Sequence, residues 1–206
     1  MDLLAELSNH RALCIVRASR VADPIGLTSV LVDARMPLVE FALNTPGALR
    51  IIEQTSTVDG AMVGAGTVLT TALARDAANA GAKYLITPGV RPEVSAEAAR
   101  LGLPVVLGAM TPTEVADAMD AGATAVKVFP ASRMGPAYFS DLRGPYPDIP
   151  LVASGGVNAG NAADYLEAGA LAVTAGGSVV GGEGDLEQVR LRAAEFVAAV
   201  ERREQS

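Results

Sequence analysis

The chain has few of the side chains on which most metal and nucleophile chemistry depends. Its 206 residues include one histidine, one cysteine and no tryptophan. With His10 alone, expected at the surface of a helix before the first strand, a histidine-ligated zinc or iron site is excluded. Neither a Ser-His-Asp nor a Cys-His arrangement fits this inventory, although carboxylates alone could hold Mg²⁺. Cys14 lies in an apolar run, so we expect a small buried hydrophobic side chain and no internal disulfide.

Positive charge and long apolar runs are also scarce. The net charge is −7 and no basic cluster is present, which argues against nucleic acid or an anionic membrane as a partner. No apolar run approaches the roughly 18 residues that a membrane span needs. The N-terminus, MDLLAELSNHR, lacks the charged, apolar and small-residue order of a signal peptide. We therefore expect a cytoplasmic enzyme, with residues 1–206 forming one domain.

The chain is rich in one repeated phrase, in which a polar residue and a glycine precede a short apolar strand. It occurs as NAGAKYLITP, RLGLPVVLGA, DAGATAVKVFP and EAGALAVTAGG. The glycine suits the left-handed backbone position that follows a helix. Extending this pattern predicts eight strands, at residues 12–17, 37–43, 61–66, 83–87, 104–108, 124–129, 150–154 and 171–176.

Helical patterns separate the predicted strands. In TPTEVADAMDAG, for example, Thr111, Pro112 and Glu114 supply an N-cap hydroxyl, a first-turn proline and a carboxylate at the third position. Strands that alternate with helices form a parallel sheet. Eight such units without a linker favour a (β/α)8 (TIM) barrel with a short N-terminal helix. The alternative is a doubly wound open sheet, but its G-x-G-x-x-G fingerprint is absent after the first strand.

In a barrel the site forms where the strands end, at their C-terminal face. Lys83 opens its strand, so we expect it at the opposite face, in solvent. Six polar residues instead close their strands and should converge on the C-terminal face: Arg17, Glu40, Thr67, Thr87, Lys127 and Ser154.

Lys127 is the leading candidate for chemistry, because the chain has two lysines and fourteen arginines and places this lysine in an apolar strand. The strand period of two puts Lys127 and Phe129 on one face and Val126 and Val128 on the other. If the valines face the helices, the lysine points into the barrel. Burial there leaves a fraction of neutral amine, which attacks carbonyls to form a Schiff base. The alternative is a lysine paired with a carboxylate for packing alone.

Three further residues at strand ends suit the same chemistry. Glu40 shares an inward face with Leu38, where a carboxylate fits a general base or an ion pair with Arg17 or Lys127. The planar fork of Arg17 suits a carboxylate or phosphate, unless it is an ordinary surface arginine. The Thr67 hydroxyl could bind a carboxylate oxygen, since the glycines of GAGT let a ligand approach the backbone; a simple turn is the alternative.

Glycines gather at the ends of the last two predicted strands, in SGGV and AGGS. In barrels, the loops after strands seven and eight often bind phosphate through backbone N–H groups. The alternative is that tight turns alone require these glycines. The residues expected at a phosphate site are Gly155, Gly156, Gly177 and Ser178.

Six segments together resemble the 2-keto-3-deoxy-6-phosphogluconate (KDPG) and 4-hydroxy-2-oxoglutarate (KHG) aldolases, over about residues 12 to 182. They are EFALNTP, VGAGTVL, LITPGV, TPTEVADAMDAGATAVKVFPAS, GPAYFSDLRGPYPDIPLVASGGV and AGGS. The resemblance implies a class I pyruvate aldolase on a (β/α)8 barrel, a homotrimer without metal or other cofactor.

The resemblance also implies roles for single residues. Lys127 matches the Schiff-base lysine and Glu40 the acid/base carboxylate. Thr67 matches the residue that holds the pyruvate carboxylate. The remaining matches line the pocket or meet the phosphate: Pro88, Phe129, Gly155, Gly156 and Ser178.

The chain departs from the family pattern at one position. Many members have a substrate-binding arginine a few residues after the glutamate, where this chain has Asn44. We infer that Arg17 supplies the guanidinium from another strand. The predicted substrate is KDPG, cleaved to pyruvate and glyceraldehyde 3-phosphate, with KHG as a possible second substrate. The alternatives are the galactonate epimer of KDPG, a Mg²⁺-dependent barrel aldolase or decarboxylase, and a non-catalytic phosphosugar-binding barrel.

Overall fold

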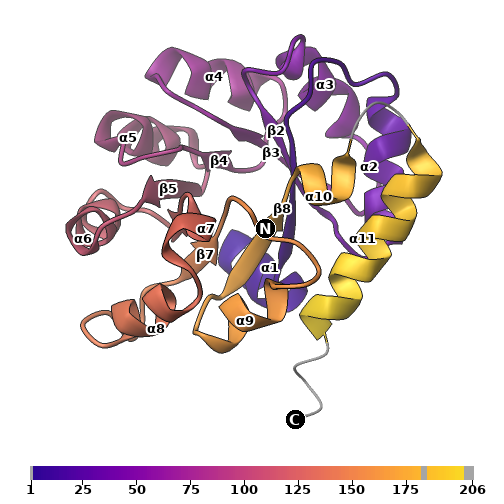
Figure 1. The fold of residues 1–206 in the computed structure, drawn as a ribbon. Helices are drawn as coiled ribbons and strands as arrows, with labels where there is room; N and C mark the ends of the chain where they lie inside the picture. Colours follow the sequence, from indigo (N-terminus) through magenta and orange to yellow (C-terminus); the bar gives the residue numbers. More distant parts are fainter. Residues whose placement is uncertain (1, 182–184, 202–206) are drawn as a thin grey trace.

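The fold is a closed barrel of eight parallel strands, described for residues 2–181 and 185–201 of the computed structural model (Figure 1). Each strand pairs with the next along the chain, and the last pairs with the first. This confirms the predicted barrel and all eight strand positions, and the doubly wound alternative is wrong. The strands are β1 (Ala12–Val16), β2 (Leu38–Ala42), β3 (Met62–Gly66), β4 (Leu85–Ile86), β5 (Val105–Ala109), β6 (Ala125–Val128), β7 (Leu151–Ala153) and β8 (Ala172–Ala175).

Helices surround the barrel on its outer side, as Figure 1 shows for α2 to α6, α8, α9 and α11. No helix in the described ranges is long and apolar enough to cross a membrane. The helices are α1 (Leu3–His10), α2 (Pro24–Asp33), α3 (Ala48–Thr55), α4 (Thr71–Asn79), α5 (Pro92–Leu101), α6 (Pro112–Asp120), α7 (Ala131–Met134), α8 (Ala137–Arg143), α9 (Ala162–Glu167), α10 (Gly177–Val180) and α11 (Leu186–Glu201).

Local sequence signals set where the helices begin and end. The predicted capping box of α6 is present, with Thr111 and Glu114 each accepting a hydrogen bond from the backbone of the other. The glycine of each repeated phrase has a positive φ, where a side chain would be strained. These turns return the chain from a helix to the next strand.

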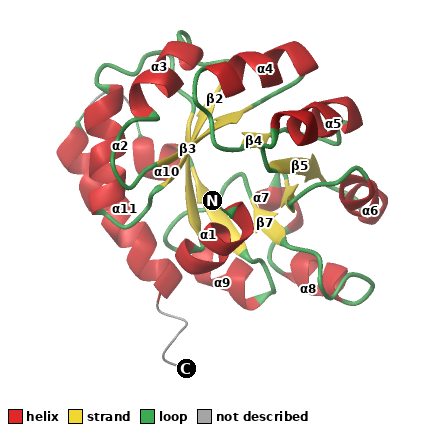
Figure 2. Cartoon of the chain, turned by 180° about the vertical axis from the view of Figure 1, so that it is seen from behind, coloured by secondary structure: helices red, strands yellow, loops and turns green. Residues whose placement is uncertain are grey.

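The N-terminal helix closes one end of the barrel. Leu3 and Leu7 of α1 belong to the same apolar cluster as the inward side chains of the strands, among them Leu13 and Leu38. Figure 2 shows α1 across this end of the barrel. The strands start here, so their C-terminal ends, and the site expected there, lie at the opposite end.

The alternation along β6 is as predicted. Val126 and Val128 pack in the larger cluster between sheet and helices, whereas Ala125 belongs to the inner cluster. Lys127 therefore points into the barrel, where only 4% of its surface is exposed. Glu40 is fully buried on the inward face that it shares with Leu38. The barrel thus encloses both residues predicted to carry the chemistry.

Candidate active site

Lys127 and Glu40 form an ion pair inside the barrel. The distance from Lys127 Nζ to Glu40 Oε2 is 3.6 Å. Neither Glu40 oxygen has a hydrogen-bond partner among the residues that the structure describes. An ion pair with Lys127 is one of the predicted arrangements of Glu40, and the pair itself is confirmed. Because a packing pair would need further hydrogen bonds to offset the loss of hydration, this bare pair is better suited to chemistry than to stability.

Two glycines of β3 make room for one side chain from β2 and one from the residue before β4. A Cβ atom at Gly66 would lie 1.6 Å from Glu40 Oε1, and one at Gly64 would lie 2.3 Å from the Tyr84 ring. The expectation that the GAGT glycines let a ligand approach the backbone is therefore wrong. They are glycines because the Glu40 carboxylate and the Tyr84 ring fill the space of their side chains.

Arg17 and Thr67 meet at the C-terminal face. Arg17 Nη2 donates a hydrogen bond to Thr67 Oγ1 at 3.4 Å. Thr67 has a φ of 58°, a left-handed conformation that is rare for a β-branched residue. The strained backbone holds the hydroxyl beside the guanidinium. Together they offer a cation and a hydroxyl, a pair of groups that suits a carboxylate.

A cavity of about 410 Å³ opens at the ends of β1, β6, β7 and β8. Lys127 lies at its base, with Nζ 5.7 Å from the centre of the Phe129 ring. Eight of the predicted site residues line it: Arg17, Lys127, Phe129, Ser154, Gly155, Gly156, Gly177 and Ser178.

Other predicted residues lie outside the cavity lining. Glu40 forms its ion pair with Lys127 of the lining, and Thr67 accepts a hydrogen bond from Arg17 of the lining. Asn44 and Pro88 are exposed and are not part of the lining. Their predicted roles stay predictions. Thr87, also expected at this face, donates a hydrogen bond to the carbonyl of Gly89.

Sequence reasoning missed Thr174, a cavity residue at the end of β8. Its hydroxyl donates a hydrogen bond to Ser154 Oγ at 2.9 Å, and both side chains are buried. Thr174 closes a strand and faces inward, so the rule that selected Ser154 would also have selected it. Asn158 is a second residue of the cavity lining that the sequence did not point to.

The glycines of the two C-terminal loops serve different purposes. Gly155 and Gly156 have φ values of 92° and 78°, and a Cβ on Gly156 would lie 2.4 Å from Ser132. The turn at both residues, and at Gly156 also the contact with Ser132, requires glycine whether or not a phosphate binds. The predicted phosphate role of this loop therefore stays a prediction. Gly177 is different, because a Cβ on it would meet nothing within 4 Å. It begins α10 beside Ser178, whose hydroxyl donates to the Val157 carbonyl at 3.0 Å.

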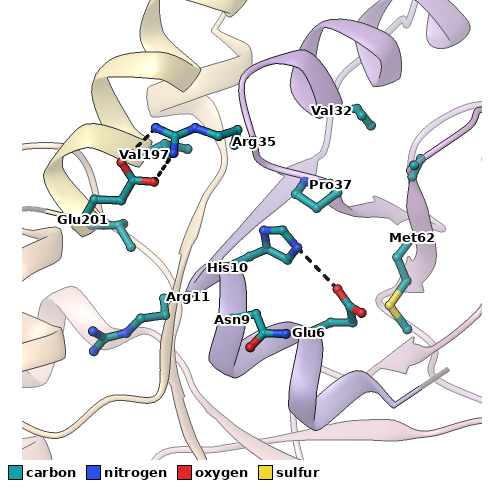
Figure 3. Close-up of a pocket in the computed structure, with 13 residues that line it drawn as sticks. Glu6, Asn9, His10, Arg11, Val32, Arg35, Pro37, Met62, Val197 and Glu201 are labelled. Carbon is teal, nitrogen blue, oxygen red and sulfur yellow. Dashed lines mark hydrogen bonds and ion pairs between the residues drawn. The ribbon is translucent and has the colours of Figure 1, made fainter. Parts of the chain in front are cut away.

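A larger hollow, of about 670 Å³, lies at the opposite end of the barrel (Figure 3). Four of its charged or titratable side chains form two pairs. His10 Nε2 lies 3.3 Å from Glu6, and Arg35 lies 2.8 Å from Glu201. His10 is only partly exposed, and neither lysine lines this hollow. It therefore lacks the nucleophile that marks the smaller cavity.

The remaining nucleophiles lie away from the cavity. Burial, with a smaller contribution from the charge of Glu40, raises the pKa of the Cys14 thiol to about 12. Cys14 is thus neutral at pH 7 and packs as a hydrophobic side chain, as predicted. Lys83 is exposed, also as predicted. Within residues 2–181 and 185–201, no three His, Cys, Asp or Glu side chains are grouped as metal ligands.

Comparison with known proteins identifies the family. The family model described as KDPG and KHG aldolase matches residues 4–193. The chain belongs to this family. The expected class, a carbon–carbon lyase of the aldolase type, is confirmed by this membership.

Individual relatives of this aldolase are named for different sugar-acid substrates. It is 35% identical to a probable 2-dehydro-3-deoxy-6-phosphogalactonate aldolase of Rhizobium meliloti (strain 1021), over 91% of this chain and 90% of that protein. It is 32% identical to a 2-dehydro-3-deoxy-phosphogluconate aldolase of Treponema pallidum (strain Nichols), over 81% of this chain and 80% of that protein. A solved structure described as native KDPGal superposes with a TM-score of 0.90 at 31% identity, covering 95% of this chain and 96% of that one.

Proposed function

We propose that this chain is a class I aldolase that cleaves 2-keto-3-deoxy-6-phospho-sugar acids through a Schiff base on Lys127. The observation that carries the proposal is the buried ion pair of Lys127 and Glu40 at the base of an open cavity. A lysine nucleophile and a carboxylate base within reach of each other are the groups that this reaction needs. No further cofactor takes part in the proposed reaction.

In the proposed reaction, the neutral amine of Lys127 attacks the C2 ketone, and loss of water gives a protonated imine. Glu40 accepts the proton of the C4 hydroxyl as the C3–C4 bond breaks, and the aldehyde leaves. The electron pair of that bond moves to the imine and forms an enamine. The enamine is protonated at C3, and water then hydrolyses the imine to release pyruvate and Lys127.

The two ends of the substrate have different partners in the cavity. The keto-acid carboxylate binds Arg17 and Thr67, which already meet at 3.4 Å. The 6-phosphate binds the backbone N–H groups of the Gly155–Gly156 loop and of Gly177 and Ser178, since these residues line the same cavity. Phe129 packs against the carbon chain between them.

KDPG is the first substrate that we propose, with glyceraldehyde 3-phosphate as the aldehyde product and KHG as a second substrate. Its galactonate epimer is the second candidate. It is favoured by the guanidinium at Arg17 in a chain with Asn44, and by the phosphogalactonate name of the Rhizobium meliloti relative. The two epimers differ in the configuration of one hydroxyl group.

A pyruvate-release assay tests the function. The purified protein is given KDPG, its galactonate epimer and KHG, with Lys127→Ala as the control. We expect rapid release from at least one 6-phosphate, no effect of EDTA, and no release by the Lys127→Ala variant. Release by that variant, or binding without turnover, would contradict the proposal. Loss of activity in EDTA would instead support the metal-dependent alternative.

We further propose that the enzyme is a homotrimer in the cytoplasm, as the family resemblance implies. Light scattering of the purified protein measures its mass in solution. Three times the 21.0 kDa of one chain supports the trimer, whereas the mass of a single chain contradicts it.

A further inference from the structure

Tyr84 is a polar side chain inside the barrel for which the proposed reaction has no role. It precedes β4 and is fully buried in the inner cluster beside Leu38 and Ile86. Its ring fills the space over Gly64, 2.3 Å from where a Cβ atom would stand. Phenylalanine would fill the same space without burying a hydroxyl group.

Three buried side-chain atoms lack a hydrogen-bond partner in the described part of the chain, and all three lie inside the barrel. They are the two carboxylate oxygens of Glu40 and the hydroxyl of Tyr84. Buried polar atoms are nearly always hydrogen-bonded, so each unpaired one needs an explanation. The two groups could pair with each other, because the Tyr84 phenol has one proton to donate and the Glu40 carboxylate accepts hydrogen bonds.

The two groups lie side by side along β3. Glu40 is paired in register with Gly64, its carboxylate lies over Gly66, and the Tyr84 ring lies over Gly64. Gly64 and Gly66 are consecutive residues on one face of the strand. Burial and then the charge of Glu40 raise the pKa of Tyr84 well above its ordinary value. The phenol is therefore protonated, and a donor, throughout the neutral range.

We propose that Tyr84 is a positioning residue, whose O–H donates a hydrogen bond to the Glu40 carboxylate while Lys127 is engaged with substrate. In the free enzyme Glu40 faces the Lys127 ammonium at 3.6 Å. Once that nitrogen is bonded to the substrate, Glu40 is free to turn toward Tyr84. The hydrogen bond then holds the carboxylate under the C4 hydroxyl. This inference rests on the proposed function.

The groups that face Glu40 define the expected pH dependence. They are Lys127 on β6 and Tyr84 before β4, whereas Cys14 on β1 is neutral and packs in the outer cluster. A hydrogen bond to a carboxylate favours its charged form, which is the form that accepts a proton. Removal of the Tyr84 hydroxyl should therefore move the acidic limb of the kcat profile to higher pH.

The test is the Tyr84→Phe variant, which keeps the ring and removes only the hydroxyl. We expect kcat to fall by about tenfold, as for loss of one hydrogen bond to a charged group, with KM changed by less than about twofold. The acidic limb of the kcat profile should move to higher pH. Tyr165→Phe is the matched control, because this buried tyrosine packs in the outer cluster against Phe139, and it should change neither quantity.

A second variant and a trapping assay keep the outcomes distinct. 3-Fluorotyrosine at position 84 keeps the hydroxyl and makes it a stronger donor, so the acidic limb should move to lower pH. Unchanged kcat and pH profiles in both position-84 variants would overturn the inference. Borohydride trapping of pyruvate on Lys127 of the unaltered enzyme tests the proposed function separately, and its failure would overturn both.

Discussion

A buried lysine and glutamate destabilise a barrel relative to two apolar side chains, because both charges lose their hydration. Only one contact, of 3.6 Å between Lys127 and Glu40, offsets this loss of hydration. No described residue donates a hydrogen bond to either carboxylate oxygen. The value of the two side chains therefore lies in chemistry. At the scale of single residues, the account divides the reaction between them: Lys127 forms the covalent bond and Glu40 moves the proton.

Glu40→Gln tests this division. The amide keeps the size of the side chain but cannot accept the C4 hydroxyl proton, so we expect cleavage to slow by about 10²–10⁴-fold, the range typical of a placed general base. Lys127 is untouched, so borohydride should still trap pyruvate on it. Cleavage within threefold of the unaltered enzyme would show that another group takes the proton.

At the scale of elements, short helices and loops line the part of the cavity where we propose that the phosphate binds. Gly177 begins α10 and faces the cavity, and its missing side chain leaves open space. Because no protein atom requires glycine there, the space is available for a ligand. The backbone N–H groups nearby can then approach an anion closely.

Gly177→Ala should weaken binding of the phosphate without disturbing the fold. We expect KM for the 6-phosphate substrate to rise about tenfold, equivalent to about 1.4 kcal/mol, while KM for KHG stays unchanged. Steady-state kinetics on both substrates measure the difference. Gly89→Ala, which also meets nothing within 4 Å, is the control and should alter neither KM. An equal rise for both substrates with Gly177→Ala would contradict the placement of the phosphate.

Helices α4 and α5 are joined by an ion-pair cluster. Glu97 accepts hydrogen bonds from Arg100 on its own helix and from Arg75 on α4. These bonds, that from Arg100 first, hold the pKa of Glu97 at about 2, below its usual 4.5. Because the folded pKa is the lower one, the stabilisation is complete above about pH 4.5 and is lost as the pH falls toward 2.

Glu97→Gln should therefore lower Tm at pH 7, and the difference from the unaltered protein should shrink between about pH 4.5 and 2. Thermal unfolding across this range measures it. Glu187→Gln, which removes an exposed pair with Arg190 within α11, should change Tm much less. A Tm difference for Glu97→Gln that does not depend on pH would contradict the stabilisation by the ionised Glu97 carboxylate.

The sequence predicted the barrel and the positions of Lys127 and Glu40, because strand alternation and strand ends are local properties. The sequence did not predict three features that depend on contacts between distant segments: the Thr67 backbone, the role of the β3 glycines and the position of Tyr84. The left-handed backbone of Thr67 comes with contacts to distant segments, from Arg17 to its hydroxyl and between Val68 and Ile86 in the backbone. The role of the β3 glycines was not predicted because the side chains that fill their space come from distant parts of the sequence, Glu40 of β2 and Tyr84 before β4. Tyr84 was overlooked because its ring fits an apolar strand.

At the scale of the whole molecule, the barrel separates the two lysines. Each strand runs from the end closed by α1 to the end with the cavity. The position of a lysine along its strand therefore determines at which end of the barrel it lies. Lys83 precedes β4 and is exposed, whereas Lys127 lies within β6 at the base of the cavity. The central claim is that this topology makes one lysine reactive toward a keto acid.

Borohydride trapping tests that claim most directly. The protein is incubated with pyruvate and sodium borohydride, digested, and its modified peptide identified by mass spectrometry. The account predicts one reduced pyruvate adduct, on Lys127, that is absent from the Lys127→Ala variant. An adduct on Lys83, or no adduct on either lysine, would contradict it.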